Sequence, residues 1–599
     1  MKRSSLRVWS AGTETAAASS LAFDLNAVSE TLTYTVAAIA FLAGAHLLLL
    51  IFRRAFRCRL RVLARGPETG NAGRLGLVKT AALDRRRQLL VVRRDGVEHL
   101  VAIGGPNDLV IESDFSGTGG RDPYEIGEDQ PGAEGPVTAR FGWIGSYIQP
   151  ASRIFVGPGL FPLAVFSGVA GAGAGLICGL FRLALEAADR LRVSLPVVWH
   201  GEPLIGCSLL IMGAAAAAAF STWLVRRFSE PAAGSGIPHV EAVINGELPP
   251  APLILLPVKF IGGLLAIGAG FALGREGPCV QMGATLANLL GKAFGRNSAD
   301  CRSLLAAGAG AGLAAAFNAP LAGAAFVMEE LTRKFETRTA IAALGASGSA
   351  IVVARLFTGP APDFYVTAMP YPVLGDNLLC IALGLVAGVL GVFYNRVLLG
   401  ALALADRLAR WPGEVRAAMV GAMVGALAWF APSLAGGGET LTQRALDGTE
   451  ALALLPSLYM LRLVLGAASY AAGTPGGLFA PLLVLGAQMG FLFGGLVDLG
   501  AADPTAHAIA FAMVGMAALF TAIVRAPLTG MILVTEMTDN SRLLLPMLAA
   551  CFSAMAVATL LREPPIYDSL KERTLALARK KNQSRSPKEA TKPVRVKAR

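Results

Sequence analysis

The stretch Gly274-Arg275-Glu276-Gly277-Pro278 places two charged residues in the middle of a chain that is otherwise rich in apolar residues. A charge at the centre of a bilayer costs roughly 2.5–3.5 kcal/mol, so we expect this pair to face protein or water. The glycines and the proline interrupt one helix and suit the first turn of the next. The stretch therefore predicts a helix N-terminus at membrane depth, where unpaired N–H groups and the helix dipole attract an anion.

The pattern occurs a second time in the chain. At an offset of 203 residues, Gly274, Pro278, Gly283, Ala284 and Gly291 recur as Gly477, Pro481, Gly486, Ala487 and Gly494. At an offset of 207, Ala319-Pro320-Leu321, Gly323 and Glu329 recur as Ala526-Pro527-Leu528, Gly530 and Glu536. A duplicated set of apolar segments interrupted by glycine and proline predicts a transporter whose binding site lies between two repeats, at broken helices.

The composition indicates a polytopic membrane protein, because 54% of the 599 residues are hydrophobic and only 16% are charged. The seven cysteines are scattered without a CxxC motif, and the five histidines are dispersed, so we expect neither a disulfide framework nor a metal site, and no cofactor. The net charge of +12 is concentrated in the tail 571–599, which holds 11 basic and 2 acidic residues. Such a tail favours a cytoplasmic C-terminus over a nucleic-acid partner.

The N-terminal part differs in character from the rest. Residues 1–30 are polar and rich in alanine, and we expect them to be flexible. Residues 31–52 are uncharged and long enough to span a bilayer, and six arginines follow between positions 53 and 65. The positive-inside rule therefore predicts a transmembrane anchor that is followed by a cytoplasmic segment. No small-residue cleavage site precedes the arginines, which favours an uncleaved anchor.

Residues 53–115 predict a small cytoplasmic β module, since two apolar runs flank Arg94-Asp95-Gly96, a strong hairpin signal. Over residues 31–115 the sequence resembles the small single-span membrane proteins of the bacterial flagellar export apparatus. The resemblance rests on Leu83-Asp84-Arg85-Arg86-Arg87, Arg93–His99 and Ile103-Gly104-Gly105-Pro106. The resemblance implies export components as partners. A generic cytoplasmic hairpin is the alternative. Residues 116–149 are rich in glycine, proline and acidic residues and predict a linker.

Residues 150–570 predict an all-α membrane transport domain with repeats over 154–338 and 373–562. Its first long apolar run, Ile154–Phe181, holds 28 uncharged residues. Several later runs are shorter than the ~20 residues needed to cross a bilayer. Short, glycine-rich runs predict partial or tilted helices that pack against protein, because non-helical backbone is tolerated in a membrane only where it is shielded.

Two further motifs predict neutral anion donors. Gly234-Ser235-Gly236-Ile237-Pro238 combines a hydroxyl, flexible backbone and a proline that starts a helix. Gly476-Gly477-Leu478-Phe479-Ala480-Pro481 is the matching turn of the second repeat, and the amides of Leu478 and Phe479 are expected to point inward. Neutral donors suit an ion that must also leave its site.

These motifs resemble the signatures GSGIP, GREGP and GxFxP of the chloride channel and transporter (CLC) family, over residues 150–570. The resemblance implies a homodimer of multi-pass subunits in the inner (plasma) membrane, each built from two inverted repeats of broken, tilted helices. It makes Glu276 the gating and external proton-transfer residue. Retention of Ser235 argues for chloride as the anion. The chloride-binding residues that the resemblance implies are Ser235, Glu276, Gly277, Leu478, Phe479 and Tyr567.

Each of these assignments has a plainer alternative. Glu276 could be an interfacial charge paired with Arg275, although its position in a break that is repeated later without the charge favours a function. Ser235 alone would be an ordinary turn residue. Tyr567 follows the last apolar run, and tyrosine is common at membrane interfaces.

The pair Glu329-Glu330 separates an antiporter from a channel. The second repeat has Glu536-Met537 instead, so Glu330 is the acid present in one repeat only. In the family the second glutamate of this pair marks exchangers, which implies that Glu330 transfers protons on the inner side. We expect Glu329 to be a solvated cap held by the nearby Arg333 and Lys334. The leading function is therefore chloride/proton antiport. The alternatives are a passive voltage- or pH-gated chloride channel and a flagellar-export-associated protein fused to a transporter.

Overall fold

The computed structural model describes residues 75–82, 88–94, 97–103, 109–113, 160–199, 201–366, 374–498 and 505–585. The chain divides into two compact units, Met1–Ala151 and Ser152–Arg599. The predicted flexible N-terminus, the anchor over 31–52, the linker over 116–149 and residues 586–599 of the basic tail lie outside the described residues.

In the first unit the described backbone forms a four-stranded antiparallel sheet in the order β1-β2-β3-β4. The strands are β1 (Leu75–Ala82), β2 (Gln88–Arg94), β3 (Val97–Ile103) and β4 (Leu109–Ser113). β2 and β3 pair from Arg94 opposite Val97 to Gln88 opposite Ile103. These strands fall within the range for which the sequence predicts a β module. The cytoplasmic location of that module and its association with export components stay predictions.

The described part of the second unit is helical. Its first half contains α2 (Leu160–Val198), α3 (Pro203–Phe228), η1 (Glu230–Ala232), α4 (Ile237–Ile244), α5 (Leu255–Gly268), α6 (Glu276–Ala293), α7 (Ser298–Phe317), α8 (Pro320–Phe326), the π turn η2 (Val327–Leu331) and α9 (Thr337–Thr358). Its second half contains α10 (Leu374–Arg407), α11 (Gly413–Phe430), η3 (Pro432–Leu434), α12 (Glu439–Leu446), α13 (Leu455–Ala471), α14 (Phe479–Val497), α15 (Thr505–Val524), α16 (Pro527–Thr538), α17 (Leu544–Leu560) and α18 (Ile566–Arg585).

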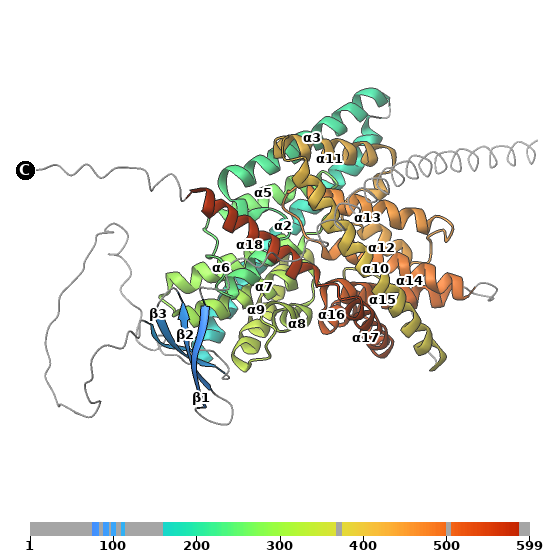
Figure 1. Ribbon diagram of the computed structural model, residues 1–599. Coiled ribbons are helices and arrows are strands. Elements are labelled where there is room, and N and C mark those ends of the chain that lie inside the picture. The colour runs from blue at the N-terminus through green and yellow to red at the C-terminus, as the bar shows by residue number, and fades with distance from the viewer. Residues whose placement is uncertain are drawn as a thin grey trace, which may run out of the picture. The chain divides into compact units, whose positions relative to one another are not determined.

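The two halves repeat one order of helices, from α2 to α9 and from α10 to α17. α6 packs on α7 as α14 packs on α15, and α2 packs on α9 as α10 packs on α17. Equivalent helices also meet each other, since α3 packs on α11 and α8 on α16 (Figure 1). The duplicated sequence pattern thus corresponds to a duplicated helix order. The inversion of one repeat relative to the other stays a prediction.

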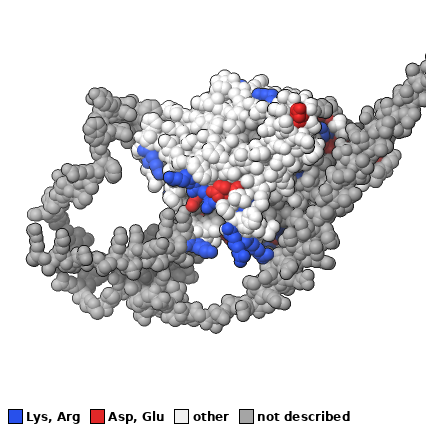
Figure 2. Space-filling model, turned by 90° about the horizontal axis from the view of Figure 1, so that it is seen from above, with Lys and Arg blue, Asp and Glu red and all other residues white. Residues whose placement is uncertain are grey.

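Within the described residues, seven helices are long and apolar enough to cross a membrane: α2, α3, α9, α10, α11, α14 and α15. Others are far too short, since α4, α8 and α12 have only seven or eight residues each. On the face that Figure 2 draws, most described side chains are uncharged, and the charged ones gather in a few clusters. The chain is therefore a multi-pass membrane protein with broken helices, as the sequence predicts.

Glycine and alanine let the central helices approach closely. α7 is buried along nearly its whole length, and its glycines face the backbones of α6 and α8. A Cβ on Gly312 would collide with the carbonyl oxygen of Cys279 on α6, and one on Gly490 of α14 would collide with that of Phe511 on α15. Small residues therefore let α6 pack closely against α7, and α14 against α15.

Candidate functional site

The two turns of the repeat lie against each other. The backbones of Gly274 and Gly477 exchange two hydrogen bonds, of 2.9 Å and 2.7 Å. α6 begins at Glu276 and α14 at Phe479, and each has a proline within its first turn. The positive ends of two helix dipoles thus meet at one point inside the protein, where they favour negative charge.

The serine motif joins the same place. The Gly234 amide donates to the carbonyl of Thr474, and the Gly476 amide donates to the carbonyl of Gly234, both over 3.1 Å. A Cβ at Gly277 would lie 2.6 Å from Ser235 Oγ, so the hydroxyl lies directly against the start of α6. The three motifs that are far apart in the sequence therefore surround one site.

Ser235 Oγ and Tyr567 OH are among the buried hydroxyls that have no hydrogen-bond partner in the described residues; Thr474 Oγ1 and Tyr394 OH are others. Ser235 immediately precedes the turn into α4, where Gly236 has a φ of 87°, which glycine adopts without strain. Tyr567 is in the first turn of α18, and its ring centroid is 6.0 Å from that of Phe479. Buried polar groups normally have partners, so unpaired hydroxyls in a core are candidates for binding a ligand.

Glu276 is completely buried, and its carboxylate interacts with the start of α14. Its Oε1 accepts a hydrogen bond of 2.6 Å from the Phe479 amide and a longer one of 3.4 Å from the Ala480 amide. Its Oε2 has no partner in the described part of the chain. The carboxylate therefore occupies amides that could otherwise hold an anion. Leu478 is buried and forms the N-cap of α14.

Aromatic rings pack around Phe479, whose amide is one of these donors. The Phe479 ring stacks on Phe317 at 6.3 Å between centroids and packs edge-on against Phe326 at 5.6 Å and Phe520 at 4.8 Å. Such rings exclude water and keep the local dielectric low, which strengthens the interaction of an anion with the nearby amides.

Sequence reasoning missed Lys259, which holds the serine turn in place. It is fully buried on α5, and its Nζ donates to the carbonyls of Ala232, at 3.0 Å, and Gly234, at 2.7 Å. The signal was present, because Lys259 is a lone charge in a long apolar run and such charges are usually functional or structural.

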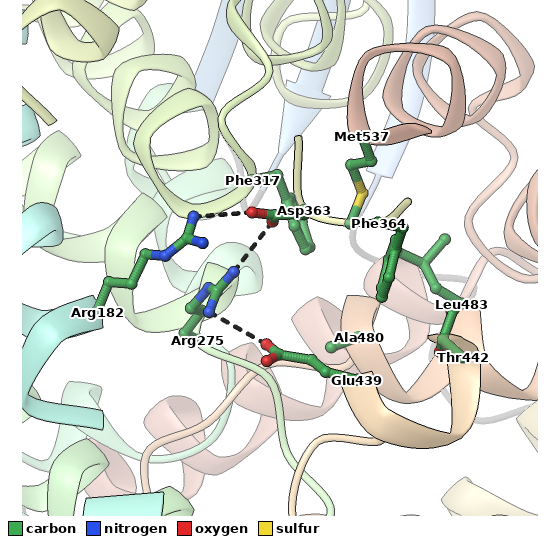
Figure 3. Close-up of a pocket in the computed structure, with 10 residues that line it drawn as sticks. All are labelled: Arg182, Arg275, Phe317, Asp363, Phe364, Glu439, Thr442, Ala480, Leu483 and Met537. Atoms are coloured by element: carbon green, nitrogen blue, oxygen red, sulfur yellow. Dashed lines mark hydrogen bonds and ion pairs between the residues drawn. The ribbon is translucent and has the colours of Figure 1, made fainter. Parts of the chain in front are cut away.

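A chain of ion pairs lies beside the start of α6. Asp363 lies between Arg182, at 2.8 Å, and Arg275, at 3.0 Å, and Arg275 also pairs with Glu439 at 3.1 Å (Figure 3). A cavity of about 600 Å³ is lined by Gly274, Arg275, Glu439 and Ala480, among others. Arg275 thus pairs with acids distant in the sequence and donates to the carbonyl of Ala316, which leaves the Glu276 carboxylate to the α14 amides.

The adjacent acids Glu329 and Glu330 have different surroundings. Glu329 accepts hydrogen bonds from the amides of Leu528, at 3.0 Å, and Thr529, at 2.7 Å, at the start of α16. The expectation that Arg333 and Lys334 hold Glu329 was wrong, because the α16 N-terminus, 199 residues away, provides better donors.

Glu330 lies in the π turn η2, and its side chain is 3% exposed. Its Oε1 has no hydrogen-bond partner among the residues described, and Arg333 approaches it only to 4.0 Å. Glu330 also lines a cavity of about 320 Å³ together with Glu329, Arg333 and Arg525. It is therefore a buried acid with spare hydrogen-bonding capacity next to open space.

No group of three or more histidine, cysteine, aspartate and glutamate side chains in the described ranges could hold a metal ion.

The family model "Voltage gated chloride channel" matches residues 216–559, more than half of the chain.

Curated relatives and solved structures agree with this match. The H(+)/Cl(-) exchange transporter ClcA of Citrobacter koseri is 37% identical over 428 residues, which cover 69% of this chain and 89% of the relative. The ClcA exchanger of Vibrio parahaemolyticus is 37% identical over 445 residues, which cover 71% of this chain and 93% of the relative. A crystal structure of a slow cyanobacterial Cl⁻/H⁺ antiporter is 33% identical with a TM-score of 0.66, covering 69% of this chain and 98% of that one. A crystal structure of a eukaryotic CLC transporter is 25% identical with a TM-score of 0.59, and the match covers 69% of this chain and 74% of that one.

The matched region contains the three motifs, the paired helix starts and the buried Glu276, and the identity to the relatives extends over more than two thirds of this chain and most of theirs. The chain belongs to the voltage gated chloride channel (CLC) family.

Proposed function

We propose that this protein is a chloride/proton antiporter of the inner (plasma) membrane. The observation that carries the proposal is the hydrogen bond between the buried Glu276 carboxylate and the Phe479 amide at a helix N-terminus. A carboxylate that occupies an anion's donors competes with the anion while it is ionised. When it takes up a proton, it loses the charge that held it there. The names of the relatives, as H(+)/Cl(-) exchangers, also support the proposal.

Chloride binds in this proposal to neutral donors. The unpaired hydroxyls of Ser235 and Tyr567 and the amides of Leu478 and Phe479 surround the ion, and Gly277 leaves room for the Ser235 hydroxyl. Two helix N-termini add a favourable potential without a fixed positive charge. An ion held by neutral groups can leave again, which transport requires.

Glu276 couples the two substrates. As an ion it accepts from Phe479 and Ala480 and excludes chloride; once protonated it moves away and chloride takes its position. Proton binding therefore favours chloride binding, and by thermodynamic linkage chloride binding favours proton binding by the same factor.

Glu330 transfers protons on the inner side. It is nearly fully buried, its Oε1 lacks a hydrogen-bond partner in the described chain, and it lines a cavity from which protons can arrive. Glu329 is unsuited to this role because its carboxylate is occupied by the α16 amides. The proposal also includes a homodimer. Light scattering of the purified protein in detergent tests this by measuring the mass of the particle.

The decisive experiment uses liposomes that contain the full chain, a chloride gradient and no proton gradient, with external pH and chloride flux recorded together. Chloride-driven proton movement in the wild type establishes antiport. Glu330→Gln should abolish proton movement while chloride flux persists, and the matched control Glu329→Gln should keep both. Chloride flux without proton movement in the wild type would make the protein a passive channel.

A further inference from the structure

Three elements that contain or directly follow proposed transport residues are joined by a cluster of five charged side chains. α4 follows Ser235, η2 contains Glu330, and α18 carries Tyr567 in its first turn. The cluster, which we call the inner ion cluster, consists of Glu241 on α4, Glu330 on η2, Arg333 just after η2, and Asp568 and Lys571 on α18.

Two short ion pairs anchor α18. Lys571 Nζ lies 2.6 Å from Glu241 Oε1, and an Arg333 terminal nitrogen lies 2.6 Å from Asp568 Oδ1. The same nitrogen is 3.7 Å from Glu241 Oε1 and 4.0 Å from Glu330 Oε1. Arg333 is thus shared by three carboxylates, and its positive φ of 51° indicates that the chain accepts backbone strain at this position.

The charges of the cluster do not balance. The three carboxylates of Glu241, Glu330 and Asp568 face only two cations, Arg333 and Lys571. The Glu241 and Glu330 side chains are each 3% exposed, and one oxygen of each has no hydrogen-bond partner in the described chain. An uncompensated charge with so little solvent is costly, and one bound proton removes it.

In the part of the chain that the structure describes, Arg333 and Lys571 are the cations that form ion pairs with these three carboxylates. Glu329, on the same element as Glu330, is held by the amides of α16. Arg525, just after α15, lines the cavity beside Glu330, but its guanidinium is turned to the backbone carbonyls of Met555 and Glu563 and the hydroxyl of Thr559, to which it donates. On α7 and α9, which also pack on η2, the side chains of Asp300 and Arg338 pair with each other.

We propose that Arg333, Asp568 and Lys571 are positioning residues for proton transfer, and that the inner ion cluster holds one exchangeable proton on Glu330. The inference rests on the proposed antiport and deepens it. With Glu330 protonated, two positive charges face two negative ones; release of the proton leaves one net negative charge beside Arg333. The balance between the α18 charges thereby sets the pH range in which the inner side loads and releases protons.

Removal of each of the two α18 charges should shift the pH profile of proton transport in opposite directions. Asp568→Asn removes one negative charge and frees Arg333 for Glu330, so Glu330 loses its proton more readily. The midpoint of the pH profile of proton transport should move to lower pH by about 0.5 to 1 unit. Lys571→Met removes a positive charge, so Glu330 holds its proton more tightly, and the midpoint should move to higher pH by a similar amount.

A matched control separates charge from helix anchoring. Arg573 on α18 forms two hydrogen bonds of 2.6 Å with Asp406 on α10, outside the inner ion cluster. Asp406→Asn therefore removes one acid and one α18 anchor without changing the charges that face Glu330. Its profile should coincide with that of the wild type.

The measurement is chloride-driven proton flux of the full chain in liposomes at a series of pH values, equal on both sides, divided by the chloride flux in the same vesicles. Opposite shifts for the two variants, with none for Asp406→Asn, support the inference. Shifts in the same direction, superimposed profiles or an equal shift in the control overturn it. Variants are first checked for a single symmetric peak in gel filtration, and Asp568→Ser or Lys571→Gln replaces any that fail. A wild type without coupled protons would instead overturn the antiport itself.

Discussion

At the scale of single residues, Glu276 determines whether the amides at the start of α14 are available to an anion. Its Oε1 holds the Phe479 amide at 2.6 Å in a fully buried position. We predict that Glu276→Ala binds chloride roughly 10-fold more tightly, about 1.4 kcal/mol, because the competing carboxylate is gone. Isothermal titration calorimetry of the purified protein with chloride measures this. Equal affinities in the variant and the wild type would show that the carboxylate and the anion do not share these donors.

Some of these residues can be recognised in the sequence, whereas others are identified only by their contacts in the folded chain. Ser235, Gly277 and Glu276 were identifiable because glycine, proline and a lone charge in an apolar run leave local signals. The contact from Lys571 to Glu241 spans 330 residues and leaves no such signal. Charged residues at a membrane boundary are common, and only the folded chain decides which of them pair.

At the scale of elements, the two repeats cap each other's helices. Glu329, at the end of the first repeat's α8 and η2, accepts from the amides at the start of α16. Glu536, near the end of α16, accepts from the amides of Leu321, at 3.0 Å, and Ala322, at 2.8 Å, at the start of α8. The helix breaks could be predicted from proline and glycine, whereas this exchange of caps needs the arrangement of both repeats.

The caps allow a matched test of stability. We predict that Glu329→Ala and Glu536→Ala each cost about 1–2 kcal/mol, because each leaves two helix N-terminal amides without their acceptor. The midpoint of thermal denaturation in detergent, followed by circular dichroism, should fall by a few degrees and by similar amounts in both. A loss confined to one variant would indicate that only that cap supports the fold. Both variants should keep chloride-driven proton transport.

At the scale of the whole molecule, the transport residues proposed here all lie in the unit Ser152–Arg599. The curated relatives match about 70% of this chain, yet the match covers 89% or more of their own length. We therefore predict that the chain without residues 1–151 exchanges chloride and protons at the same ratio and rate as the full chain. Parallel flux assays in liposomes at equal protein density test this. A changed ratio in the shortened chain would assign the first unit a part in coupling, whereas a lower yield with an unchanged ratio would limit that unit to membrane insertion or assembly.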